Sequence, residues 1–219
     1  RRIETRVLVC RADGGVFGAS YKWRSDGRDA DLVTEPITTS INAEGNPPRA
    51  WYFPGTADCR VCHTPAAGGV LGVKTRQLNR PLGQTRENQL ITWKRQGFFN
   101  SIPRPFNPEQ FEKLASSNDA SRTIEDRARS YLDVNCSNCH RPGGVAGNFD
   151  ARYDTPLSHQ NLIDGPVLID LGLDRARVIS PHDVWRSIAL ARVETSDLTR
   201  MPPLAHETID HDGGQLLRS

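Results

Sequence analysis

The first quarter of the chain alternates apolar and polar residues with the period of a β-strand. Ile3 to Val9 alternate with polar neighbours, and residues 17–23 alternate again after Asp13-Gly14-Gly15. Two alternating runs on either side of a glycine-containing turn predict a β-hairpin. A further short strand is expected near Leu32 and Val33, and Asn46-Pro47-Pro48 then indicates a linker.

Farther along the chain the apolar period lengthens to that of helices. Thr123 can cap a helix with acidic residues in its first turn, and its apolar face is Ile124, Ala128, Tyr131 and Leu132. Ser180-Pro181-His182-Asp183 predicts the start of another, with Val184, Ile188 and Ala191 on one face. Two more are expected: one from Thr85 to before Gly97, and one from Asn107 with Phe111 and Leu114 inward.

The composition describes a loop-rich globular chain. The 219 residues include 18 glycines and 15 prolines, with 37% hydrophobic and 25% charged residues. No stretch approaches ~18 consecutive apolar residues, so no membrane span is expected. The net charge of +2 and the lack of a basic run argue against a nucleic-acid partner. The chain starts at Arg1 rather than Met, so we expect a processed or excised segment that has lost an export signal.

Four of the five cysteines form two pairs, and a histidine follows each pair directly. Cys59-Arg60-Val61-Cys62-His63 and Cys136-Ser137-Asn138-Cys139-His140 both read Cys-x-x-Cys-His, the attachment sequence of c-type haem. Each pair of thiols can bond the two vinyl groups of one haem, and the histidine supplies the proximal ligand of the iron. We therefore expect two covalently attached haem c groups, with His63 and His140 as iron ligands.

Two other uses of the cysteines are weaker. A zinc site needs paired Cys-x-x-Cys sequences, but these lie 77 residues apart, whereas ~15–20 residues usually separate zinc-binding pairs. A disulfide framework leaves the two histidines unexplained. The fifth cysteine, Cys10, has no obvious partner and is expected to be a buried structural thiol.

The second motif is followed by the single methionine of the chain. Met201 lies in Arg200-Met201-Pro202-Pro203-Leu204, where the prolines stiffen the loop. A thioether is a soft sixth ligand that raises the potential of haem iron, so we expect Met201 to bind the second haem. This order of helix, motif, helix and Met-Pro-Pro resembles a class I cytochrome c. Such domains also have a long terminal helix, of which residues 210–219 offer only Leu216 and Leu217.

The sixth ligand of the first haem stays open, because no Met or His lies between His63 and His140. The candidates are His159, His182, His206, His211, a deprotonated Lys74, or no protein ligand at all. An iron without a sixth ligand could react with peroxide or another small molecule. Trp51-Tyr52-Phe53, just before the motif, could pack on a porphyrin edge or serve as ordinary core.

Several stretches are similar to a family of exported bacterial dihaem c-type proteins. They are Trp51-Tyr52-Phe53-Pro54, both haem motifs, Leu71 to Arg80 and Asn88-Gln89-Leu90, so the resemblance covers most of the chain from about Tyr21 onward. It implies redox work without naming a substrate. Members are often the carboxy-terminal part of larger exported proteins, sometimes behind a propeller-type, sugar-dehydrogenase-like domain.

Together these observations predict a mainly α fold: two cytochrome c-like haem domains with a small amino-terminal β-hairpin segment. The expected division is residues 1–57, 58–120 and 121–219. The expected function is single-electron transfer between redox partners in the bacterial periplasm or outside the cell, where haem is attached to thiols. The alternatives are a dihaem peroxidase-like enzyme with an open first haem, and the electron-acceptor domain of a larger dehydrogenase.

Overall fold

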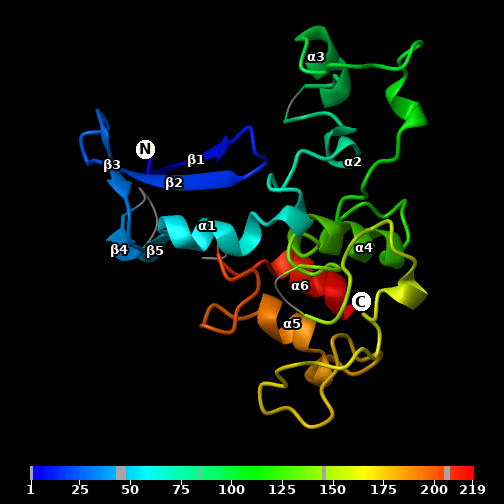
Figure 1. The fold of residues 1–219 in the computed structure, drawn as a ribbon. Coiled ribbons are helices and arrows are strands. Elements are labelled where there is room, and N and C mark those ends of the chain that lie inside the picture. Colours follow the sequence, from blue (N-terminus) through cyan, green and yellow to red (C-terminus); the bar gives the residue numbers. More distant parts are fainter. Residues whose placement is uncertain (1, 43–47, 84, 145–146, 205–207) are drawn as a thin grey trace.

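The structure is a computed structural model that describes residues 2–42, 48–83, 85–144, 147–204 and 208–219 (Figure 1). Its strands are β1 (Glu4–Cys10), β2 (Val16–Trp23), β3 (Ala30–Val33), β4 (Ile37–Ile41) and β5 (Arg49–Phe53). Its α-helices are α1 (Thr56–Cys62), α2 (Thr75–Leu78), α3 (Gln89–Arg95), α4 (Ile124–Asn135), α5 (Ile188–Val193) and α6 (His211–Arg218).

The amino-terminal hairpin and the strand after it are confirmed. Strands β1, β2 and β3 form an antiparallel sheet in that order, with Val7 opposite Ala19. A second hairpin follows, in which β4 pairs with β5 and Thr39 lies opposite Trp51. The aromatic run considered as a porphyrin-packing segment is therefore a strand. Phe53, only 1% exposed, belongs to the core of this region.

The expected mainly α fold is wrong. The structure is mixed α/β, with 27% helix and 17% strand. One reason is the second hairpin, whose strand β4 was not expected at all. The other reason is that most of the helices are short, because proline and glycine interrupt the segments between them.

Three expected helices differ from the observed ones. The helix expected from Thr85 begins only after Asn88, whose side chain accepts a hydrogen bond from the Leu90 N–H, and ends as α3 before Gly97. The segment at Asn107 makes a single 3-10 turn. The segment after Ser180 makes another such turn and then α5, because Ser187 between them has an extended backbone with ψ 97°.

Helix α4 is confirmed and carries the main core of the second half. Thr123 Oγ accepts a hydrogen bond from the Asp126 N–H at 3.1 Å, as a helix cap does. The carboxyl groups in the first turn suit the positive end of the helix dipole. The buried residue on its inner face, Leu132, packs with Ala151, Leu162 and Val178.

The last residues form the eight-residue α6 in place of a long terminal helix. It packs against α4 and α5. A Cβ at Gly213 would lie 2.4 Å from the Tyr131 ring, so only glycine at this position lets the backbone of α6 approach α4 so closely.

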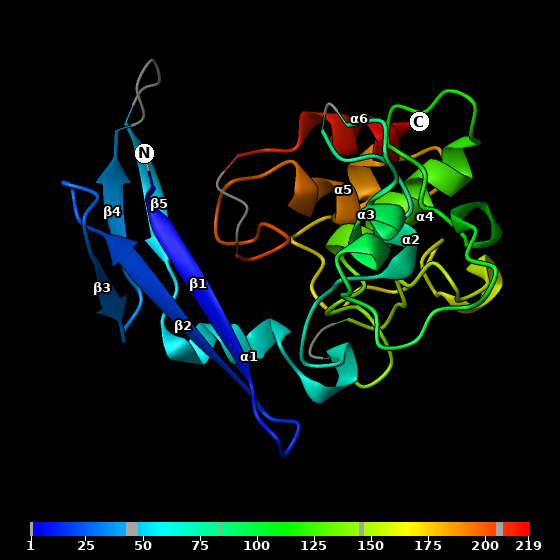
Figure 2. The same cartoon turned by 90° about the horizontal axis from the view of Figure 1, so that it is seen from above.

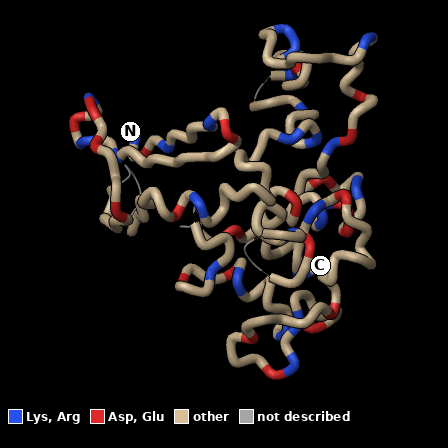
Figure 3. The backbone as a smooth tube through the Cα atoms, viewed as in Figure 1, with Lys and Arg blue, Asp and Glu red and all other residues tan. Residues whose placement is uncertain are grey.

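The sheets and the helical unit lie on opposite sides of the molecule (Figure 2). Helix α1 packs against β2 and runs from the sheets toward the helical unit. Basic and acidic residues are interspersed along the backbone (Figure 3). Among the described residues no helix combines the length and the apolar character that crossing a bilayer requires.

Cys10 does not have the expected burial. It is an exposed free thiol at the end of β1, opposite Val16. The reason is that β1 is an edge strand of a small sheet, and most of its side chains face solvent.

Candidate functional site

The first haem motif lies on α1, and the start of this helix is fixed to β5. The Asp58 carboxylate accepts hydrogen bonds from the Gly55 N–H at 2.9 Å and from the Tyr52 hydroxyl at 2.7 Å. Burial raises the pKa of Tyr52 to about 12, and the hydrogen bond to Asp58 acts in the same direction. The phenol therefore stays a donor, and the second hairpin holds the helix that carries the two thiols.

Cys59 and Cys62 are three positions apart on α1, which places them on one helical face. A Cβ at Gly18 of β2 would lie 2.5 Å from Cys59 Sγ, so the glycine lets the helix approach the sheet. Sequence reasoning missed this residue. The available signal was a glycine inside an alternating strand, which marks close approach of another group.

His63 ends α1 and has one ring nitrogen engaged. Its Nδ1 lies 2.8 Å from the Gly69 carbonyl oxygen, so the Nδ1–H donates to that carbonyl. This tautomer leaves the Nε2 lone pair available to a metal, and the hydrogen bond fixes the orientation of the ring. Gly69 was a second residue that the sequence did not reveal, because its role depends on a backbone carbonyl.

The second motif begins where α4 ends. Cys136 is the C-cap of the helix, and the His140 N–H donates to the Cys136 carbonyl at 2.9 Å. Burial raises the pKa of Cys136 to about 12. The His140 ring stacks on Phe149 with 4.1 Å between ring centroids and 18° between planes.

His140 is held as a neutral imidazole. Burial lowers its pKa, and the positive charge of Arg192 lowers it further. Among the described residues its buried Nδ1 has no hydrogen-bond partner. A neutral imidazole has one nitrogen with a free lone pair, which is the form that binds a metal.

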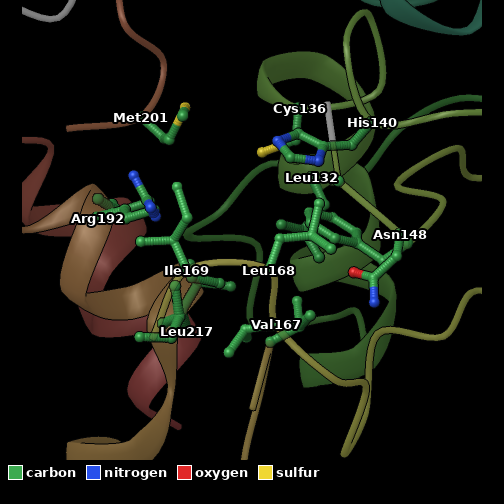
Figure 4. Close-up of a pocket in the computed structure, with 16 residues that line it drawn as sticks. Leu132, Cys136, His140, Asn148, Val167, Leu168, Ile169, Arg192, Met201 and Leu217 are labelled. Atoms are coloured by element: carbon green, nitrogen blue, oxygen red, sulfur yellow. The ribbon is translucent and has the colours of Figure 1, made fainter. Parts of the chain in front are cut away.

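A cavity of about 340 Å³ brings together three of the predicted haem residues, Cys136, His140 and Met201 (Figure 4). His140 and Met201 lie on facing sides of it. The lining is mostly aliphatic, and two of its side chains, Leu168 and Ile169, are 76% and 62% exposed. A cavity with apolar walls and a few placed polar groups is typical of a cofactor site.

Met201 is positioned by α5. Its N–H donates to the Arg192 carbonyl at 3.0 Å, and Arg192 Nη1 donates to the Thr199 carbonyl at 2.8 Å. These two hydrogen bonds connect the end of the helix to the loop on either side of Arg200. Arg192 was not singled out from the sequence, although it also lines the cavity.

These residues fit a haem better than they fit the other uses of cysteine. The second site brings a methionine sulfur, an imidazole and the Cys136 thiol to a cavity with aliphatic walls, a set of groups that suits an iron porphyrin. Within the described ranges no three His, Cys, Asp or Glu side chains converge as a zinc site requires. All five cysteines are free thiols, so the structure contains no disulfide framework.

The candidates for the sixth ligand of the first haem are placed as follows. Lys74 Nζ donates to Asp133 Oδ2 at 2.8 Å, to Ser137 Oγ at 3.0 Å and to the Asp133 carbonyl at 3.5 Å, so its three donors are already used. His159, His182 and His211 are exposed. His206 lies outside the described residues.

Comparison with models of protein families, with curated proteins and with solved structures finds no match to this chain.

Proposed function

We propose that this protein is an exported dihaem c-type cytochrome that transfers single electrons between redox partners. The observation that carries the proposal is the apolar cavity into which Cys136 and His140 of the second motif and Met201 of a separate loop converge. In this proposal Cys59 and Cys62 hold one haem and Cys136 and Cys139 hold the other. His63 and His140 bind the irons, and Met201 is the sixth ligand of the second.

The chain's own residues hold and shield the cofactors. Haem iron supplies a one-electron couple between its ferric and ferrous forms. The Gly69 carbonyl orients the His63 ring, and Phe149 supports the His140 ring from one face. The aliphatic walls around His140 offer a low-polarity surrounding, which would favour the less charged ferrous form. Simple electron transfer requires no acid or base at the second site.

Haem is attached to thiols outside the bacterial cytoplasm, so we place the protein in the bacterial periplasm or outside the cell. The partner is then a redox protein or a dehydrogenase of that compartment, in the same or another polypeptide. The exposed aliphatic pair Leu168 and Ile169 lies at the cavity, so a partner can approach the second haem there.

The test is to express the protein with an added export signal, together with the haem-attachment machinery, and to measure the mass of the intact product by mass spectrometry. Two haems per chain are expected. Cys59→Ala/Cys62→Ala and Cys136→Ala/Cys139→Ala should each lose one haem and keep the other. A bare polypeptide after correct export would overturn the proposal.

The same sample separates electron transfer from catalysis. A pure electron carrier is expected to have two low-spin haems whose spectra do not change when peroxide or cyanide is added. A high-spin first haem that reacts with peroxide would instead identify a dihaem peroxidase-like enzyme.

A further inference from the structure

The two haem motifs touch each other, although they lie far apart in the sequence. Cys62 Sγ and Cys139 Sγ, the second thiols of the two pairs, are 3.8 Å apart. This is van der Waals contact between two sulfur atoms. Nothing in either pentapeptide predicts it, because the contact depends on how the two halves of the chain pack.

Hydrogen bonds on both sides of the two sulfurs hold the motifs together. Arg141 Nη1, just after the second motif, donates to the Ala66 carbonyl just after the first at 2.8 Å. Lys74 reaches from the first half to Asp133 and Ser137 in the second. The Asp133 side chain is only 4% exposed, so this ion pair is well shielded on the acidic side. The sulfur contact is therefore part of a built junction.

The other two thiols of the motifs point elsewhere. Cys59 Sγ lies against β2 at Gly18. Cys136 lines the aliphatic cavity and packs against the core of the second half. Each proposed haem thus has one attachment point at the junction and one away from it.

We propose that the Cys62–Cys139 contact is the point where electrons cross between the two haems. This inference rests on the proposed function, because it requires a thioether on each sulfur. One electron leaves the ferrous iron of one haem, which becomes ferric, and reduces the ferric iron of the other. No bond is made or broken and no proton moves. The route runs through covalent bonds on both sides and makes its one through-space step between the two sulfurs.

The first experiment uses the wild-type holoprotein. Mass spectrometry establishes that two haems are bound, and circular dichroism then records the Soret band. Two haems attached at touching sulfurs should give a bisignate couplet from coupling of their Soret transitions. Two attached haems without a couplet would overturn the inference and leave the proposed function intact, whereas a missing haem would count against the proposed function itself.

The second experiment compares Cys62→Ser with Cys59→Ser. Each leaves the first haem on a single thioether, but only the first removes the sulfur at the junction. After flash photoreduction of the protein, electron redistribution between the haems should be slowed several-fold more in Cys62→Ser than in Cys59→Ser. Equal rates in both variants would rule out the crossing point. If Cys62→Ser binds no first haem, Cys139→Ser compared with Cys136→Ser gives the same contrast from the other side.

Discussion

The two pentapeptides share the order Cys-x-x-Cys-His but lie in different surroundings. The first is on a short helix beneath a sheet, and its histidine donates a hydrogen bond to the Gly69 carbonyl. The second follows a longer helix, and its half-buried histidine stacks on Phe149 beside an aliphatic cavity that Met201 also lines. Burial and the neighbouring Arg192 cation lower the pKa of His140.

This difference shows which properties a haem motif fixes and which it leaves to its neighbours. In the proposed function, the spacing of the thiols and the histidine determines haem attachment in both halves. Burial, the sixth ligand and the nearby charges come from residues outside the pentapeptide. We therefore expect two haems with different reduction potentials, in contact through Cys62 and Cys139. The predictions below test how far the two halves of the chain behave independently.

The largest effect is expected at the ion pair that joins them. Lys74→Met leaves the buried Asp133 carboxylate without its cation, and because the lysine side of the pair is 28% exposed, we expect a loss of ~2–3 kcal/mol of unfolding free energy, below the ~3–5 kcal/mol of a fully buried pair. Urea denaturation measures the change. Lys113→Met, at an exposed lysine, is the matched control and should change stability by less than ~0.5 kcal/mol. Equal stability of the two variants would mean that Lys74 does not join the halves.

Sequence reasoning worked best where the information was local. The hairpin of β1 and β2, the strand at Val33 and the capped helix α4 follow from period and capping alone, and all three were confirmed. It failed at β4 and β5. A strand pair separated by a proline-containing stretch resembles a linker, and the aromatic residues of β5 also suit a cofactor edge.

The candidate site shows the same division. The structure brings Cys136, His140 and Met201 to one cavity, and sequence order alone had suggested this grouping. Gly18, Gly69, Phe149 and Arg192 were missed, because their roles depend on contacts between distant segments. The Lys74–Asp133 pair was missed for the same reason, and Lys74 was instead considered as an iron ligand.

Met201 tests whether the redox properties of the two haems are independent. Met201→His replaces a soft thioether with a nitrogen ligand, which should lower the potential of the second haem by on the order of 100 mV, well within the ~0.8 V range set by axial ligands. Potentiometric titration should show one couple shifted and the other in place. Equal shifts of both couples, or no shift, would contradict the assignment of Met201 to the second haem alone.

Asp150 allows a test of whether acid unfolds the helical half of the chain before the amino-terminal sheets. Burial raises its pKa, but hydrogen bonds from Arg152 and Thr155 outweigh this and hold it at about 2. The folded pKa is below the unfolded value of 3.8, so the stabilisation is present above about pH 4 and is lost as pH falls toward 2. The pKa difference corresponds to ~2 kcal/mol.

Hydrogen exchange resolved by peptide measures this effect. Between pH 4 and 2, protection should fall in the segment around α4 and α6 before it falls in β1–β3. Asp150→Asn should lower protection near pH 6 in the same segment and reduce its loss in acid. Loss of protection at the same pH in both regions, with or without Asp150, would show that the halves unfold as one unit.

The smallest effect is expected at Arg192, the positive charge at the cavity. A cation near the iron disfavours the ferric form, so Arg192→Gln should lower the potential of the second haem. A change of about tenfold in the one-electron equilibrium corresponds to ~59 mV.

Arg192 also donates to the Thr199 carbonyl, so a control must separate loss of the charge from loosening of the Met201 loop. Arg192→Lys distinguishes the two causes, because it keeps the charge and changes the hydrogen bond. A potential that falls in Arg192→Gln and is retained in Arg192→Lys assigns the effect to charge, whereas equal falls in both assign it to the loop.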